Sequence, residues 1–485
     1  MRLFTIYIIA LLFAATQIYS QIPYNQRYKS EVFSTTSVIS DVVYGNAPAL
    51  NFPYINEGDT SPQDLLMDIY LPDNDTLQYR PAIVCAHSGA FVSGSKTADD
   101  MVAFCDSLSH RGYVAVSIDY RLGMNVLSSS SSVRAVYRGI QDGRAAVRFL
   151  KENGDTYGID TNNIYFLGSS AGAFIALHNM FLDCEEERPP ETYSSPDLGC
   201  LDCSGNSFNH NGKSNGIVSL WGALNDTNII VSTDTLPVFL VHGTADATVP
   251  FDYGSPFGNS YFPPTYGSRL IDLQLSYYGN SAENYFVAGA GHEFYGTSNG
   301  NWNVQPNAYW DTVFNKTVDF FYDIHKPEAN FWLTGFENVV VIYDSSKNAT
   351  AWYWDFGDGY YSTEQNPVHE YNNSGTYHIT QFVINGLTSW DTTSQSVDIF
   401  VGINEMKSKE LKVFPNPAGS FVNIVSNGKL TSIEILNISG KVVANKRFNG
   451  NKITINTQNM SGGTYIVRAT GENKPVITTK FFLKK

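Results

Sequence analysis

The chain has 485 residues, which is long for one average domain and predicts about two to four domains. Its composition, 43% hydrophobic and 14% aromatic, is that of a globular protein. The formal net charge of −15 at pH 7 argues against nucleic acid or an anionic membrane surface as the main partner, since both would repel the chain.

The first 20 residues have the pattern of a secretory signal peptide. One cation, Arg2, precedes an apolar run at 3–15, and more polar residues follow near position 20. This run is too short to span a membrane comfortably. We therefore expect a signal peptide at 1–20 and a mature chain that leaves the cytoplasm.

Apolar runs alternate with helix-like stretches from about residue 61 to residue 325. This alternation predicts an α/β fold, in which a mostly parallel sheet is covered by helices on both faces. The expected domain covers 21–326. Its expected strands are 67–71, 82–86, 114–118, 164–167, 217–221, 238–241 and 285–287. Its expected helices are 98–111, 133–153, 171–182, 266–278 and 308–325.

The segment 183–216 breaks this alternation, because it is long, polar and contains cysteines. Long loops in compact domains are usually lids or binding loops, so we expect a lid-like insertion that shapes the substrate entrance. In an exported protein, a disulfide from Cys184 to Cys200 or Cys203 would crosslink it. A zinc site is the alternative, but these three cysteines lack a well-spaced fourth ligand.

The composition changes after the α/β region to short aromatic and β-branched runs separated by Gly, Asn, Ser and Pro. This pattern predicts a β-sandwich at 327–402. A charged linker at 403–410 then separates it from a third unit, also all-β, at 411–485.

A Gly-Ser-Ser-Ala-Gly pentapeptide at 168–172 lies between an expected strand and an expected helix. In that context G-x-S-x-G is typical of a nucleophile elbow, a sharp turn that exposes the serine hydroxyl. Ser170 is therefore the candidate nucleophile. The same pattern recurs at 212–216 and 296–300 without the strand and helix, and we interpret both as turns.

A serine nucleophile needs a base and an acid that orients the base. In α/β-hydrolase folds these residues follow in the chain order Ser, Asp or Glu, His, each after a strand. Asp246 lies in a turn after the expected strand 238–241, and His292 follows the expected strand 285–287. Both fit the order, so Ser170, Asp246 and His292 are the predicted catalytic residues.

Other interpretations of these residues stay open at this point. An aspartate after Gly-Thr can be an ordinary turn residue, and a histidine flanked by glycine can be an ordinary loop residue. Asp226 is the rival acid. His242 lies very close to the end of its strand, so we expect it to have a structural role.

An oxyanion hole requires backbone N–H groups near the nucleophile. Ala171, directly after Ser170, would supply one of them. The small residues after the expected strand 82–86 would supply the other, from Gly89 or Ala90.

The motifs above, with segments at 86–91, 117–122, 168–172, 242–246 and 291–292, together resemble the α/β-hydrolase carboxylesterases with a His-Gly-Gly oxyanion loop. The resemblance, of the BD-FAE and lipase type, covers about residues 30–325. Ser88 replaces the first glycine of the loop motif. The resemblance implies a serine esterase that requires no cofactor and no metal.

Two further resemblances concern the C-terminal half. The segments 352–359, 366–371 and 375–377 resemble a PKD domain, an immunoglobulin-like sandwich that usually serves as a spacer or contact module. Contact with a glycan or a surface is therefore an expectation. Asp355 and Asp358 are expected to form turns, with cation binding as the alternative.

The segments 411–417, 433–443, 463–467 and 480–485 resemble a type IX secretion C-terminal sorting domain. That resemblance implies recognition by the secretion machinery and export through the periplasm and outer membrane of a Gram-negative bacterium, to the cell surface or the medium.

The sequence thus predicts a secreted serine carboxylic ester hydrolase that works through an acyl-enzyme. Its expected substrates are extracellular esters, such as acetyl or feruloyl esters of polysaccharides, short-chain lipids or polyesters. A serine peptidase of the same fold and a non-catalytic surface adhesin are the alternatives.

Overall fold

The structure, a computed structural model, describes residues 27–336, 338–400, 411–471 and 477–485. The expected signal peptide at 1–20 and the expected linker at 403–410 lie outside these ranges. The chain forms two compact units. The first comprises residues up to Ala329 with Ser346–Ala351 and Phe382–Thr392, and the second comprises Asn330–Ser345, Trp352–Gln381 and Thr393–Lys485.

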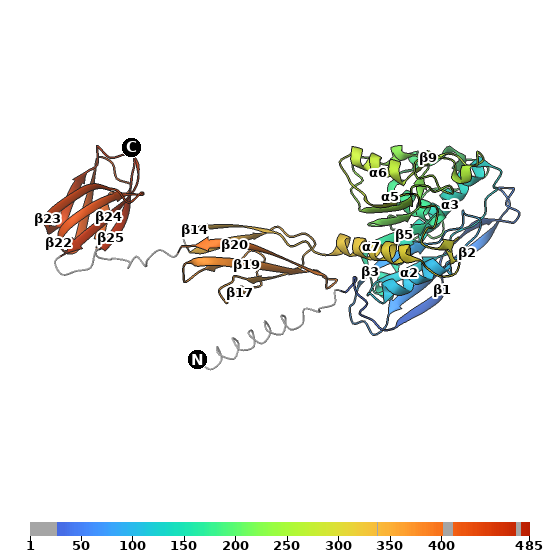
Figure 1. The fold of residues 1–485 in the computed structure, drawn as a ribbon, viewed down its shortest axis with the longest axis horizontal. Helices are drawn as coiled ribbons and strands as arrows, with labels where there is room; N and C mark the ends of the chain where they lie inside the picture. The colour runs from blue at the N-terminus through green and yellow to red at the C-terminus, as the bar shows by residue number, and fades with distance from the viewer. Residues whose placement is uncertain (1–26, 337, 401–410, 472–476) are drawn as a thin grey trace. The chain divides into compact units, whose positions relative to one another are not determined.

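The first unit contains an eight-stranded sheet in the order β1-β2-β4-β3-β5-β6-β8-β11 (Figure 1). The strands are β1 (Thr36–Leu50), β2 (Thr60–Pro72), β3 (Arg80–Ala86), β4 (Val114–Ile118), β5 (Ile159–Ser169), β6 (Ile217–Leu220), β8 (Val238–Gly243) and β11 (Glu283–Val287). β2 is antiparallel to both of its neighbours, β1 and β4. The remaining neighbours are parallel, which confirms the predicted sheet.

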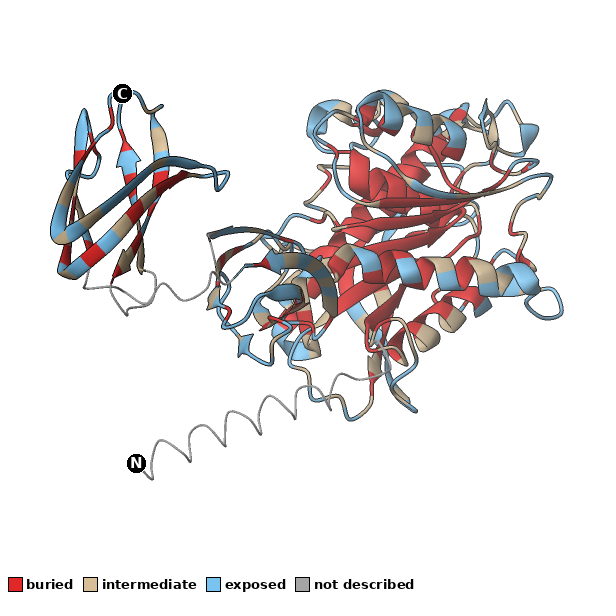
Figure 2. Ribbon diagram, turned by 60° about the vertical axis from the view of Figure 1, so that its left-hand side comes forward, coloured by how far each residue is buried: buried red, intermediate tan, exposed pale blue. Residues whose placement is uncertain are grey.

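Within the described residues, five helices of ten residues or more cover this sheet. They are α2 (Asp99–Ser109), α3 (Ser129–Glu152), α5 (Ala171–Phe181), α6 (Ser268–Tyr277) and α7 (Ala308–His325). Side chains of α3, α5 and α6 belong to one hydrophobic cluster, and those of α2 and α7 to another, so the helices form two layers with the sheet between them. Figure 2 shows the buried strands between these helices.

The central strands are continuous apolar runs because both of their faces are covered. All residues of β4 and β8 are buried. Helix α5 is buried along its whole length, which explains why its sequence shows no polar face. Because β3, β5, β8 and β11 are parallel, the loops at their carboxyl ends meet at one edge of the sheet.

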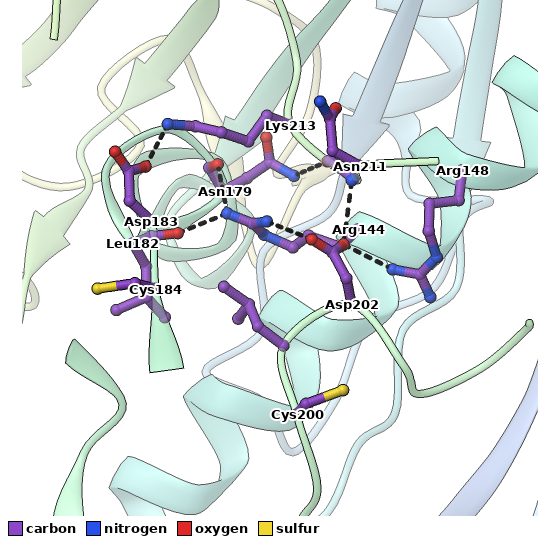
Figure 3. A network of polar contacts seen from close by, with 12 residues as sticks. Arg144, Arg148, Asn179, Leu182, Asp183, Cys184, Cys200, Asp202, Asn211 and Lys213 are labelled. Atoms are coloured by element: carbon purple, nitrogen blue, oxygen red, sulfur yellow. Dashed lines mark hydrogen bonds and ion pairs between the residues drawn. The ribbon is translucent and has the colours of Figure 1, made fainter. Parts of the chain in front are cut away.

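The insertion 183–216 lies against helix α3 through ion pairs between two buried arginines and a partly exposed aspartate (Figure 3). Arg144 and Arg148 each place a guanidinium nitrogen 2.8 Å from the carboxylate of Asp202. Arg144 also donates to the carbonyl of Leu182 at 2.5 Å. Lys213 pairs with Asp183 at the two ends of the segment.

The expected disulfide from Cys184 is wrong in this structure. Cys200 is bonded to Cys203, and Cys184 is a free, exposed thiol. The ion pairs of Asp202 hold the turn between the two bonded residues, whose Cα atoms lie 5.5 Å apart. In Figure 3 the sulfur atoms of Cys184 and Cys200 point in different directions.

The PKD-like region consists of two small sheets. One contains β14 (Phe331–Phe336), β15 (Val339–Asp344) and β18 (Val368–Glu370), and the other contains β17 (Tyr361–Ser362), β16 (Ala351–Asp355), β19 (Gly375–Ile384) and β20 (Trp390–Ile399). Buried aromatic and aliphatic side chains, including Trp354, Tyr371 and Ile379, fill its core. Asp355 accepts a hydrogen bond from the amide of Gly357, as a turn residue does.

The C-terminal sheet contains β21 (Leu411–Phe414), β22 (Phe421–Asn437), β23 (Val442–Asn456), β24 (Gly463–Gly471) and β25 (Ile477–Leu483). Buried and exposed residues alternate along β24, which is the pattern of a strand with one face on a core. Val422, Ile435, Val467 and Phe481 are among the core residues.

Candidate active site

Ser170 occupies a strained turn between β5 and α5. Its φ is 52° and its ψ is −111°, a conformation that a residue with a side chain rarely adopts. The flanking glycines make the turn feasible. A Cβ at Gly168 would lie 2.0 Å from the carbonyl oxygen of Gly172, and a Cβ at Gly172 would lie 2.0 Å from that of Ala86. Any larger residue at either position would displace the backbone around Ser170.

The structure brings the predicted base and acid to Ser170. His292 Nε2 lies 2.9 Å from Ser170 Oγ, and His292 Nδ1 lies 2.7 Å from Asp246 Oδ2. A carboxylate only accepts hydrogen bonds, so Nδ1 carries the proton and Nε2 is free to accept the serine proton. This is the arrangement in which a histidine acts as the base of a serine nucleophile.

The Asp246 carboxylate is buried and fully hydrogen-bonded. Its Oδ1 accepts from the amides of Thr248 and Val249 at 2.8 and 2.9 Å. Burial by itself raises the pKa of a carboxyl, but the hydrogen bonds from His242 and His292 outweigh it and hold the pKa of Asp246 well below its usual range. Asp246 is therefore ionised at neutral pH.

His242 lies closer to this site than its place in the sequence indicated. Its Nε2 is 3.0 Å from the carbonyl of Val249 and 3.3 Å from Asp246 Oδ2. The carbonyl can only accept, so Nε2 carries a proton that faces both oxygens. The Ser268 hydroxyl, 2.8 Å from Nδ1, fixes that tautomer. The signal in the sequence was a histidine four residues before the acid, but only the fold shows their contact.

Asp226, the rival acid, does not contact the histidine of the site. Its carboxylate accepts from the amide of Asn228 at 2.9 Å and caps a short 3-10 turn at Thr227–Ile229.

The loop after β3 has the backbone strain expected of a site loop. Gly89, Ala90 and Phe91 all have positive φ, at 121°, 52° and 59°. A Cβ on Gly89 would lie 2.1 Å from the carbonyl of Ser93, so this position requires glycine. Of the two candidate donors in this loop, Ala90 lines the pocket together with Ser170 and Ala171.

An apolar pocket of about 70 Å³ opens beside Ser170. Phe91, Val136, Phe174 and Phe257 are among the side chains that line it. Among the described residues that line this pocket, none comes from the insertion 183–216, which the ion pairs hold on helix α3 instead. Part of the pocket wall is formed by residues between Val249 and Thr265.

The parallel sheet and the serine turn at its edge define an α/β-hydrolase fold. Three family models match parts of the chain. Residues 67–225 match the BD-FAE family, 338–401 match the PKD domain, and 412–484 match the Secretion system C-terminal sorting domain. The chain thus has a sorting domain that marks it for export, to the medium or the cell surface. No helix within the described residues is both long and apolar enough to cross a membrane.

Curated relatives align with limited segments. Neuroligin-like protein glit-1 of Caenorhabditis elegans is 34% identical over 140 residues, which is 28% of this chain and 18% of that protein. Gut esterase 1 of Caenorhabditis briggsae is 36% identical over 94 residues, 19% of this chain and 17% of that protein. The chain therefore spans less than a fifth of the length of these relatives.

Among solved structures, the propionate-bound esterase Est2 of the planctomycete Thermogutta terrifontis is 20% identical, with a TM-score of 0.40. The alignment covers 59% of this chain and 93% of that chain.

Proposed function

We propose that this protein is a secreted serine carboxylic ester hydrolase. The observation that supports this most directly is the hydrogen-bonded series Ser170, His292 and Asp246, whose serine lines an apolar pocket. The match to the BD-FAE family and the similarity to Gut esterase 1 support the same class of reaction.

In the proposed first step, Ser170 Oγ attacks the ester carbonyl while His292 Nε2 takes the hydroxyl proton. The carbonyl oxygen then becomes an oxyanion, which the amides of Ala171 and of Ala90 or Gly89 stabilise. When the tetrahedral intermediate collapses, His292 returns the proton to the leaving alcohol, and the acyl group stays on Ser170.

In the second step, water attacks the acyl-enzyme, and His292 takes the proton from that water. The acid product leaves when Ser170 Oγ regains its proton. Asp246 keeps the imidazole in the required tautomer and stabilises the imidazolium that forms in each step. The side chains and amides of the chain perform all of these roles.

The pocket supports a short, apolar acyl group. Its lining is mostly aromatic and aliphatic, and its volume of about 70 Å³ holds only a few carbon atoms. Acetyl esters of polysaccharides and short-chain lipid esters fit such a pocket better than long-chain lipids. Export of the chain places this substrate outside the cytoplasm.

The test is hydrolysis of p-nitrophenyl acetate, butyrate and octanoate by the mature protein. We expect turnover of acetate and butyrate, with kcat/KM for octanoate no higher than that for butyrate, since methylenes that stay outside the pocket gain none of the roughly 0.8 kcal/mol that burial of each would supply. Faster hydrolysis of octanoate would contradict the proposed pocket. Absence of turnover of all three esters, with cleavage of peptides or with no activity, would favour the peptidase or the adhesin.

His242 is expected to increase the rate by holding Asp246. Substitution of His242 by phenylalanine removes one donor to a buried carboxylate, and we expect kcat to fall about tenfold with a smaller change in KM. Kinetics on the butyrate ester measure this. Ser268→Ala, which removes only the hydroxyl on Nδ1, is the matched control and should lose less. An unchanged kcat in folded His242→Phe would show that the other hydrogen bonds suffice for Asp246.

The other partners follow from the C-terminal modules. We propose that residues 411–485 bind the type IX secretion machinery, in line with the matched sorting domain. We also propose a glycan contact for the PKD-like module. Trp332 and Tyr343 are stacked at 4.0 Å between ring centroids and are 52% and 37% exposed, and aromatic faces of this kind suit sugar rings.

A further inference from the structure

The first turn of helix α2 is bonded to the loop that follows His292. The amide of Asp100 donates to the carbonyl of Gly300 at 2.9 Å, and the Tyr295 hydroxyl donates to Asp100 Oδ2 at 2.7 Å. Within the loop, Glu293 accepts from the amide of Gly300 at 3.3 Å. Glu293 directly follows the proposed base and has a positive φ of 47°. The backbone position of His292 is thus coupled to these contacts.

The same carboxyl borders the oxyanion loop. Asp100 Oδ1 and Ser88 Oγ both lie next to Gly300. A Cβ added to Gly300 would be 2.8 Å from Asp100 Oδ1 and 3.2 Å from Ser88 Oγ. Each is buried and has no hydrogen-bond partner within the described residues. Asp100 and Tyr295 are fully buried, and Glu293 is nearly so. Asp100 therefore lies between the loop of the base and the loop of the oxyanion hole.

We propose that Asp100 is a positioning residue that, as a neutral carboxylic acid, holds the loop of His292 in register with the oxyanion loop. The proposal rests on the hydrolase function proposed above. It adds a residue that belongs neither to the Ser170, His292 and Asp246 set nor to the oxyanion donors.

The surroundings of Asp100 favour its neutral form. Burial, reinforced by the charge of Glu293, raises the pKa of Asp100 to about 8, against the opposing hydrogen bond from Tyr295. The charged side chains that act most strongly on it are Glu293, from the histidine loop, and Asp99, from its own helix, and both are carboxylates. Ser88, from the oxyanion loop, is uncharged, and burial keeps Tyr295 protonated by raising its pKa well above the usual value.

Ionisation of Asp100 would place a second negative charge beside Glu293 in a buried cluster. Repulsion between the two carboxylates would displace the loop that positions His292. The rate should therefore fall as the pH rises through about 8. An amide at position 100 keeps the acceptor for Tyr295 and cannot ionise.

The experiment compares the full-length mature parent with Asp100→Asn, Asp100→Leu and Asp106→Asn, measuring kcat and KM for p-nitrophenyl butyrate from pH 6 to 10. Asp106→Asn makes the same carboxyl-to-amide change at a half-exposed position of the same helix and is the matched control. We expect the parent and this control to lose kcat about tenfold between pH 8 and 10. The kcat of Asp100→Asn should fall less than about twofold over the same pH range. The kcat of Asp100→Leu should be about tenfold below the value of the parent at neutral pH and should not change further with pH, and its KM should be little changed.

A second measurement needs no substrate. Because the pKa of Asp100 is raised in the folded state, protonation of this carboxyl favours the folded protein over the unfolded chain. That contribution to the free energy of unfolding is complete below about pH 4 and is lost as the pH rises to about 8. The melting temperature of Asp100→Asn relative to the parent should therefore rise between pH 4 and 8 and then level off.

Several outcomes would overturn this role for Asp100. The same alkaline loss of kcat in Asp100→Asn as in the parent would do so, as would a melting difference that does not change with pH. Should Asp100→Leu fail to fold, the comparison of the parent with Asp100→Asn still decides. A parent without esterase activity would refute the proposed function, while the melting measurement would still test whether Asp100 is neutral.

Discussion

Replacement of Ser170 by alanine is expected to lower kcat for p-nitrophenyl butyrate by about 10⁵-fold or more. The variant loses the atom that forms the acyl-enzyme, so only the oxyanion hole and substrate binding remain to accelerate the attack of water. The geometric reason is specific to this residue, because Ser170 Oγ lies 2.9 Å from His292 Nε2. Steady-state kinetics measure the loss, and circular dichroism checks that the variant is folded.

Ser298→Ala is the matched control for this variant. Ser298 is the exposed serine of another G-x-S-x-G pentapeptide, at 296–300, and it lies in the short strand β12 (Thr297–Ser298), with no helix after it. Its kcat should stay within about twofold of the parent. A phosphonate inhibitor should add its mass to the parent and to Ser298→Ala but not to Ser170→Ala. Equal labelling of Ser170→Ala would show that another residue is the nucleophile.

Substitution of Asp246 by asparagine is expected to lower kcat by about 10⁴-fold, with KM changed much less. The asparagine amide can donate toward His292 Nδ1, which then accepts and leaves the imidazole proton on Nε2. That proton faces Ser170 Oγ, so the histidine can no longer take the hydroxyl proton. The two backbone donors at Thr248 and Val249 still hold the side chain, which keeps the fold intact.

Asp226→Asn is the control for this prediction, since Asp226 was the rival acid in the sequence and only caps a turn in the structure. We expect its kcat to stay within about threefold of the parent. A larger loss in Asp226→Asn than in Asp246→Asn would reverse the assignment of the acid.

The sequence alone predicted the features that depend on local patterns. The alternation of buried strands and helices sufficed for the α/β fold, because a parallel sheet covered on both faces needs apolar runs of that kind. The glycines around Ser170 marked the elbow. Gly168 relieves a close contact within the turn, with Gly172, whereas Gly172 makes room for the carbonyl of Ala86 on the neighbouring strand. The order of Asp246 and His292 after their strands sufficed to propose both, because parallel strands bring their loops to one edge.

Strand β1 was missed for a local reason. Many of its residues are exposed, as expected for the strand at the edge of the sheet, so it lacks the apolar run that marked the central strands. The pairing of Cys200 with Cys203 depends on how Asp202 contacts Arg144 and Arg148 more than 50 residues away, and spacing along the sequence does not reveal that contact.

The sequence by itself thus determined the fold class, the modules and the candidate residues at the sheet edge, because those follow from periodicity and strand order. Only the tertiary structure decided which neighbours tune those residues. His242 reaches Asp246 because the turn between them folds back, and Tyr295 bonds to Asp100 across 195 residues of sequence. A hydrogen bond requires its two partners to lie about 3 Å apart in space. The number of residues between two partners along the sequence does not show whether the fold brings them that close.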